Sequence, residues 1–181
     1  MSLPVLKTAR LVLRPVAQGD ADRIVELVGN FDVARMLSLV PHPYRREDAL
    51  WWIDQTCAYA DGGERAFAID EGSGLIGAVS VGRDGPAPEF GYWLGKPYWG
   101  RGLMTEAGRA ALAWYFEAFR DASILSGALD ENSASLNVLR KLGFAGPHPH
   151  RLRIKSRGQD LPGTRVRLTF ETFNSAARVL S

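Results

Sequence analysis

The chain has 181 residues, of which 46% are hydrophobic and 23% charged, and these proportions are typical of a globular protein rather than a disordered or fibrous one. Its 22 basic and 20 acidic residues leave a formal charge of +2, which gives no argument for a polyanionic partner, and its single cysteine, Cys57, excludes an intramolecular disulfide framework. Because the sequence shows no secretion signal and no apolar run long enough to cross a bilayer, we expect a cytoplasmic protein of one domain over residues 1–181, without a membrane partner.

The first third of the chain predicts a strand followed by two amphipathic helices. Residues 10–14 read as the strand, and Asp20 stands where it can cap the first helix. Apolar residues at helical spacing then form two stripes: Ile24, Leu27, Val28 and Phe31, and later Ala49, Trp52, Ile53, Cys57 and Ala60. The place of Cys57 on its stripe favours a buried structural thiol over an acyl carrier.

Three strands are expected next. Residues 65–70 and 75–81 alternate around the turn residues 71–74, which predicts an antiparallel hairpin. Residues 89–94 form the third strand, and the glycine inside it, Gly91, indicates either a bulge or a close approach of another backbone.

Two glycines bracket one arginine in residues 98–106, where this strand gives way to a helix. The helix is expected to bury Leu103, Ala107, Ala110, Ala111, Trp114 and Ala118. Glycine permits a close approach of the backbone, and unpaired N–H groups together with the helix dipole favour an anion at a helix N-terminus. Arg101 adds a charged donor, so the segment predicts a phosphate site, although a tight turn without a ligand has the same pattern.

The last third of the chain predicts a strand, a helix and two more strands. Residues 123–129 form the strand, Asn132 or Ser133 caps the helix, and Gly143 followed by Phe144 suits a left-handed helix end. Leu136, Leu139 and Leu142 give this helix its apolar face. Residues 152–154 and 166–170 alternate as strands, with Gly158 and the pair Pro162 and Gly163 in their connection.

The glycine turn, followed by the segment that starts at Asn132, resembles the GNAT acetyltransferase superfamily. Residues 9–15, 20–22 and 89–94 resemble its RimJ/RimL-like branch, which contains the ribosomal-protein N-terminal acetyltransferases. The resemblance implies one GNAT-like α/β (α+β) domain with a mixed, mainly antiparallel sheet, helices on both faces and central strands splayed to admit acetyl-CoA. It also implies an acetyl-CoA-dependent N-acetyltransferase that modifies a primary amine, such as a protein N-terminus or a small amine.

The resemblance assigns the cofactor-binding residues. The backbone of residues 99–104 would bind the pyrophosphate, with Thr105 beside it. The strand of residues 89–94 would offer its backbone to the pantetheine arm. The full set is Tyr92, Trp93, Leu94, Trp99, Gly100, Arg101, Gly102, Leu103, Met104, Thr105 and Asn132. Trp99 and Met104 depart from the residues common in the superfamily, which leaves their side-chain contacts open, and Asn132 has helix capping as its alternative role.

Two residues are candidates for catalysis. Many members of the superfamily carry a tyrosine seven residues after the asparagine as the acid for the departing thiolate, whereas this chain has Leu139. Ser135 is the nearest replacement, as a donor to the sulfur, and Glu89 is the candidate base, directly or through water. Alternatively, Ser135 lies on the surface of the helix without a catalytic role, and Glu89 is an exposed carboxylate at the end of a strand.

Other functions remain open at this level. The missing tyrosine is compatible with a non-catalytic acyl-CoA sensor. The basic residues Arg151, Arg153, Lys155, Arg157, Arg165 and Arg167 suggest RNA or ribosome binding, although the wet face of two strands explains them as well. His148 and His150 lack further metal ligands at suitable spacing, so we expect them in an exposed loop and expect no metal. We also expect no DNA partner. A homodimer is compatible with the family but has no signal of its own here.

Overall fold

The computed structural model describes residues 3–57, 64–82, 87–119 and 123–179. Within these residues one sheet has eight strands, in the order β1-β2-β3-β4-β5-β6-β8-β7. The strands are β1 (Leu6–Lys7), β2 (Val12–Pro15), β3 (Arg65–Asp70), β4 (Leu75–Gly82), β5 (Glu89–Leu94), β6 (Ile124–Leu129), β7 (Ala145–Ile154) and β8 (Gln159–Leu168). Every neighbouring pair is antiparallel except β5 and β6, which are parallel, so the prediction of a mixed, mainly antiparallel sheet is confirmed.

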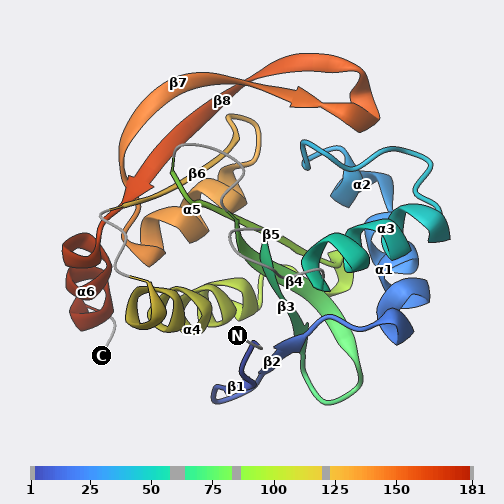
Figure 1. Cartoon of the computed structure of the whole chain (residues 1–181). Helices are drawn as coiled ribbons and strands as arrows, with labels where there is room; N and C mark the ends of the chain where they lie inside the picture. Colours follow the sequence, from blue (N-terminus) through green and yellow to red (C-terminus); the bar gives the residue numbers. More distant parts are fainter. Residues whose placement is uncertain (1–2, 58–63, 83–86, 120–122, 180–181) are drawn as a thin grey trace.

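Helices cover both faces of the sheet, as Figure 1 shows. They are α1 (Ala21–Val28), α2 (Phe31–Ala34), α3 (Arg46–Cys57), α4 (Leu103–Ala118), α5 (Ser133–Leu142) and α6 (Phe170–Val179). Two separate cores result. One joins α4, α5 and α6 to one face, and the smaller one joins α1 and α3 to the other.

The β3–β4 hairpin forms as the sequence predicts. Its turn is stabilised by Asp70, whose Oδ1 accepts hydrogen bonds from the N–H groups of Gly72 and Gly74 at 2.7 and 3.1 Å. Both glycines have positive φ angles, of 103° and 109°, which other residues resist. The hairpin therefore has a local cause that the sequence alone reveals.

Three details of the predicted helices are wrong. Phe31 does not continue the stripe of α1 but begins α2, with 45% of its surface exposed. Asp20 stands at the N-cap of α1, yet its side chain binds Arg14 and the N–H of Ala17 instead of capping the helix. The buried face of α4 is rotated relative to the predicted stripe: Ala118 is exposed, whereas Met104, Gly108, Leu112, Tyr115 and Phe116 are buried. Ala60 and the side chain of Cys57 lie outside the described residues.

The C-terminal part differs more from the prediction. Pro162 and Gly163 lie inside β8 rather than in a connection, because Gly163 allows a close approach to β6: a Cβ there would lie 2.8 Å from the carbonyl oxygen of Ala128. The strand ends at Leu168 instead of residue 170, and Phe170 begins α6, a helix that was not predicted from the sequence. The Thr169 hydroxyl accepts a hydrogen bond from the N–H of Thr172, so a capping threonine stops the strand there.

The β7–β8 hairpin arches across the molecule toward α2 (Figure 1). At its tip the N–H of Lys155 donates to the carbonyl of Ser38, and Oγ of Ser156 donates to the carbonyl of Ala34, both at 3.0 Å. Gly158, with a φ of 62°, turns the chain at this tip, as predicted. The hairpin is therefore anchored at both ends, in the sheet and at the N-terminal helices.

Candidate active site

The glycine turn between β5 and α4 leaves several backbone donors unused. Gly100 and Gly102 both have a φ of 73°, and Gly102 is the N-cap of α4. Within the described part of the chain, no acceptor is bonded to the N–H groups of residues 102–105, and the first intrahelical acceptor, the carbonyl of Gly102, serves Glu106. Together with the helix dipole, these N–H groups make an anion-binding end of a 16-residue helix.

Arg10 fixes this turn from the other end of the chain. Its Nη1 donates to the carbonyl of Arg101 at 3.0 Å, and its Nε donates to Glu106 Oε2 at 2.7 Å. The Thr8 hydroxyl donates to Oε1 of the same carboxylate at 2.6 Å. Burial alone would raise the pKa of Glu106, but the hydrogen bonds from Thr8 and Arg10 outweigh it and hold that pKa below its usual value. With the carbonyl of Arg101 bound by Arg10 and that of Gly102 bound by the N–H of Glu106, the turn presents its N–H groups.

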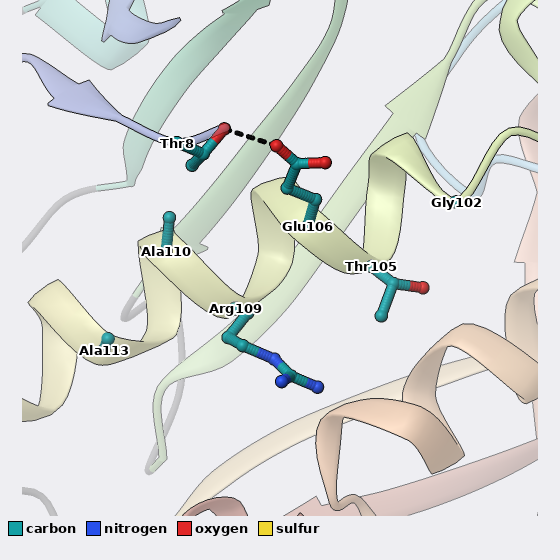
Figure 2. Close-up of a pocket in the computed structure, with 7 residues that line it drawn as sticks. All are labelled: Thr8, Gly102, Thr105, Glu106, Arg109, Ala110 and Ala113. Carbon is teal, nitrogen blue, oxygen red and sulfur yellow. Dashed lines mark hydrogen bonds between the residues drawn. The ribbon is translucent and has the colours of Figure 1, made fainter. Parts of the chain in front are cut away.

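A surface cavity of about 470 Å³ opens at this turn and along α4. Its lining residues are Thr8, Gly102, Thr105, Glu106, Arg109, Ala110 and Ala113. Figure 2 shows Glu106 pointing toward Thr8, with Thr105 and Arg109 on another side of the same helix. Two residues predicted to bind the cofactor, Gly102 and Thr105, thus border an open space of ligand size.

The side chains of Trp99 and Arg101 have partners within the protein. Nε1 of Trp99 donates to the carbonyl of Leu94 at 2.7 Å, which fastens the turn to the end of β5. The guanidinium of Arg101 pairs with Glu71 at 2.9 Å. The backbone of the turn is therefore the part that stands ready for a ligand, and a phosphate contact by the Arg101 side chain stays a prediction.

The central strands splay as expected. β5 and β6 pair at one position, Glu89 with Leu125, and then diverge. Just beyond it the Ser126 hydroxyl donates to the carbonyl of Phe90 at 2.8 Å, in place of a backbone donor. Since strand residues two apart face the same neighbour, Tyr92 presents its backbone groups to the open gap. This exposed strand edge is where an extended amide-bearing chain can add its hydrogen bonds.

Gly91 lies opposite Ser80 in an undisturbed register between β4 and β5, so the alternative of a bulge is wrong. A Cβ at Gly91 would lie 3.3 Å from Oγ of Ser80, which is a side-chain contact, so Gly91 makes room for packing and the close approach of another backbone stays a prediction. Trp93 packs with the core of α1 and α3, whereas Leu94 belongs to the core under α4.

Asn132, Ser135 and Tyr92 meet at the N-terminus of α5. Oδ1 of Asn132 accepts a hydrogen bond from the N–H of Ser135 at 3.1 Å, so Asn132 caps the helix. The Tyr92 hydroxyl lies 2.7 Å from Oγ of Ser135 and donates to its carbonyl at 3.0 Å. The contact joins β5 to α5 beside the gap between β5 and β6 and gives Ser135 a partner within the protein, and its catalytic role stays a prediction.

Glu89 begins β5 at the point where the two strands part. Its Oε1 pairs with Nη2 of Arg165 on β8 at 2.7 Å, and its side chain remains 56% exposed. The carboxylate is thus held in place and still reachable by water. Nε of Arg165 is buried without a hydrogen-bond partner among the described residues, which leaves a further donor beside this carboxylate.

Other candidates from the sequence lie outside this cluster. His148 and His150 are exposed in β7, a strand rather than the expected loop. Among the described residues no three His, Cys, Asp or Glu side chains gather as metal ligands. Of the basic residues, Arg157 in the tip of the hairpin pairs with Glu131, and Arg151 on β7 donates to the carbonyl of Asp160, so both have partners within the protein. None of the described helices has the length and apolarity to span a membrane.

Three residues of the site had no assigned role at the sequence level: Arg10, Ser126 and Arg165. Arg10 was part of the quoted motif and Arg165 part of the basic set, but their partners lie 91 and 76 residues away in the chain. Ser126 had a usable signal, since it is a hydroxyl in an otherwise apolar strand.

Comparisons with known proteins agree with these features. The family model of the acetyltransferase (GNAT) domain matches residues 10–145. The uncharacterized N-acetyltransferase p20 of Bacillus licheniformis is 26% identical over 149 residues, which cover 78% of this chain and 83% of that protein.

Two solved structures show the same fold. Mycobacterium smegmatis RimJ in complex with CoA-disulfide matches with a TM-score of 0.80 at 21% identity, over 94% of this chain and 88% of that chain. The ribosomal-protein-S5-alanine acetyltransferase of Vibrio fischeri matches with a TM-score of 0.79 at 20% identity, over 94% and 98% of the two chains.

Proposed function

Since the chain belongs to the acetyltransferase (GNAT) domain family and is an acetyl-CoA-dependent acyltransferase, we propose that it transfers the acetyl group to a primary amine by direct attack in a ternary complex. One observation carries the proposal: the unused N–H groups of residues 102–105 lie at the end of the strand whose free edge faces the gap between β5 and β6. The pyrophosphate of acetyl-CoA needs free N–H groups, and its extended pantetheine arm needs a free strand edge next to them.

The residues fit the donor on physical grounds. Backbone N–H groups at a helix N-terminus bind phosphate oxygens without any particular side chain, so the unusual Trp99 and Met104 are tolerated. The backbone of Tyr92 offers hydrogen bonds to the pantetheine amides, and Trp93 and Leu94 extend the same strand. We place Asn132 beside this arm, with its Oδ1 already used by the N–H of Ser135.

The reaction needs a base and a stabilised leaving group. An amine is largely protonated at neutral pH, with a reference pKa of about 8 for an N-terminus and about 10.4 for lysine. Glu89 takes that proton directly or through water, and the freed nitrogen bonds to the acetyl carbon. As the amide forms, the nitrogen gives up its second proton to water. As the carbon–sulfur bond breaks, its electron pair moves to sulfur, toward which Ser135 donates a hydrogen bond.

We propose a protein N-terminus as the acceptor, with a small amine as the second candidate. The fold shared with RimJ and with the ribosomal-protein-S5-alanine acetyltransferase supports the first. The anchored β7–β8 hairpin supports it as well, because Arg165 on β8 reaches Glu89 and so sets the candidate base beside an extended strand surface. Acceptor specificity in such enzymes depends on the loops around the site.

The test is release of coenzyme A from acetyl-CoA in the presence of an acceptor panel. Peptides with a free N-terminus, the same peptides with a blocked N-terminus, free lysine and a polyamine separate the acceptor classes. We expect release with at least one free amine, together with a mass gain of one acetyl group on that amine. Binding of acetyl-CoA without transfer to any acceptor would favour the sensor, and absence of both binding and release would refute the proposal.

A further inference from the structure

Tyr92 has a side-chain contact that its predicted role, through the strand backbone, does not use. Its hydroxyl oxygen lies 2.7 Å from Oγ of Ser135 and 3.0 Å from the carbonyl oxygen of the same residue. Its ring packs against Phe90, with 5.3 Å between the ring centroids, so the phenol is held from both ends. The contact joins two residues that are 43 positions apart.

The phenol carries one proton and faces two acceptors. When that proton points to the Ser135 carbonyl, Oγ of Ser135 must donate to the phenol oxygen, and the serine proton is used up. When the phenol donates to Oγ instead, the serine proton is free to point elsewhere. A sulfur on which negative charge develops selects the second arrangement, because it attracts that free proton.

We propose that Tyr92 is a positioning residue that holds Oγ of Ser135 and donates to it, so that the serine proton is directed at the sulfur of acetyl-CoA. The inference rests on the proposed function and adds the residue that makes a serine competent there. It also gives a structural substitute for the phenol that Leu139 does not supply: the hydroxyl comes from β5 instead of from α5.

The environment indicates a hydrogen-bond donor rather than a proton source. Burial raises the pKa of Tyr92 well above its usual value of 10.0, and the hydrogen bond with Ser135 only partly opposes that rise. A thiol has a reference pKa of about 8.5, so a proton passed from this phenol to the thiolate would move uphill. The phenol therefore stays protonated through the cycle, and the thiolate is stabilised by donated hydrogen bonds.

The test measures the thiol pKa of coenzyme A bound to the enzyme, from the ultraviolet absorbance of the thiolate, in four proteins. These are the unchanged chain, Tyr92→Phe, Ser135→Ala and the double variant. Tyr115→Phe is the control, because it removes a buried phenol hydroxyl from α4, where the ring of Tyr115 packs against Trp114, Phe116 and Phe119. Thermal unfolding of each variant shows that it is folded.

We expect the thiol pKa to rise in Tyr92→Phe and in Ser135→Ala, and to rise no further in the double variant, because the two hydroxyls act as one unit. The kcat of acetyl transfer should fall about tenfold in Tyr92→Phe, because one hydrogen bond is lost. The KM for acetyl-CoA should change less than about twofold. The control should match the unchanged chain.

Two results would overturn the proposal in distinguishable ways. A raised thiol pKa in Ser135→Ala but not in Tyr92→Phe would leave the serine role intact and reduce Tyr92 to a packing contact. An unchanged thiol pKa in both variants would remove the role of Ser135 as well. Because the thiol pKa of bound coenzyme A is measured without an acceptor, neither result depends on which amine the enzyme uses.

Discussion

Nη1 of Arg10 donates a hydrogen bond to the carbonyl of Arg101 at 3.0 Å, across 91 residues of chain. The same side chain binds Glu106 in the first turn of α4, so one arginine connects the start of the chain to both sides of the glycine turn. The order of this turn, whose backbone we propose to bind phosphate, thus depends on a residue outside it.

Replacement of Arg10 by methionine should raise the KM for acetyl-CoA about tenfold, because the loss of charged hydrogen bonds lets the turn relax. The value of kcat should change less than about twofold, since the reacting groups lie elsewhere. Steady-state kinetics with varied acetyl-CoA give both values. Arg46→Met, which breaks an exposed ion pair with Asp22, is the matched control. Equal effects of the two variants would show that Arg10 contributes surface charge alone.

Gly102→Ala should weaken coenzyme A binding and also lower stability. A Cβ meets nothing closer than Arg10 Nη2 at 3.8 Å, so the cost comes from the φ of 73°, about 1 to 2 kcal/mol for a residue with a Cβ. Gly72→Ala imposes a similar strain in the β3–β4 turn, at a φ of 103°. Calorimetric titration with coenzyme A should show a weaker Kd for Gly102→Ala alone, and similar weakening in both variants would count against the phosphate site.

Glu89→Gln should lower kcat about a hundredfold, as removal of a general base does. Arg165→Gln breaks the same ion pair but keeps the Glu89 carboxylate, so the fall in kcat in this variant should be less than about tenfold. The pH profile of kcat/KM for the two variants separates proton transfer from positioning. Should Glu89→Gln retain both rate and profile, another group is the base.

Asp20 gives a prediction for pH and stability. Burial would raise its pKa, but the hydrogen bonds from Arg14 and from the N–H of Ala17 outweigh it and lower the pKa from 3.8. Because the folded-state pKa is the lower one, the ion pair stabilises the fold fully above the unfolded value and is lost as the pH falls through the folded value.

Asp20→Asn should therefore destabilise the protein at neutral pH by about 2 to 3 kcal/mol, the cost of losing hydrogen bonds to a charged group. The difference between variant and unchanged chain should shrink as the pH falls below about 4, the reference range for aspartate. Urea unfolding at a series of pH values measures this, and a difference independent of pH would contradict the account.

The elements that depend on local pattern were predictable from the sequence. The bounds of β3 and β5 agree with the prediction, because alternation and turn residues define them within a few positions. The capped helix α5 and its left-handed end at Gly143 agree as well, with a φ of 96°. The glycine turn and Asn132 could be recognised from the family resemblance, because each belongs to a motif of consecutive residues.

What depends on distant partners was not predictable. The pairs of Arg10 with Arg101, of Tyr92 with Ser135 and of Glu89 with Arg165 form only when the sheet brings their elements together. Gly163 misled the prediction because its small size serves a close approach to β6 rather than a turn. Local propensity yields to tertiary packing at such positions.

The most direct test of the central claim is a crystal structure of the chain with coenzyme A. The account predicts pyrophosphate oxygens within hydrogen-bond distance of the N–H groups of residues 102–105 and the pantetheine arm along the backbone of Tyr92. A donor seated elsewhere, with these N–H groups bonded to the protein's own acceptors, would contradict it.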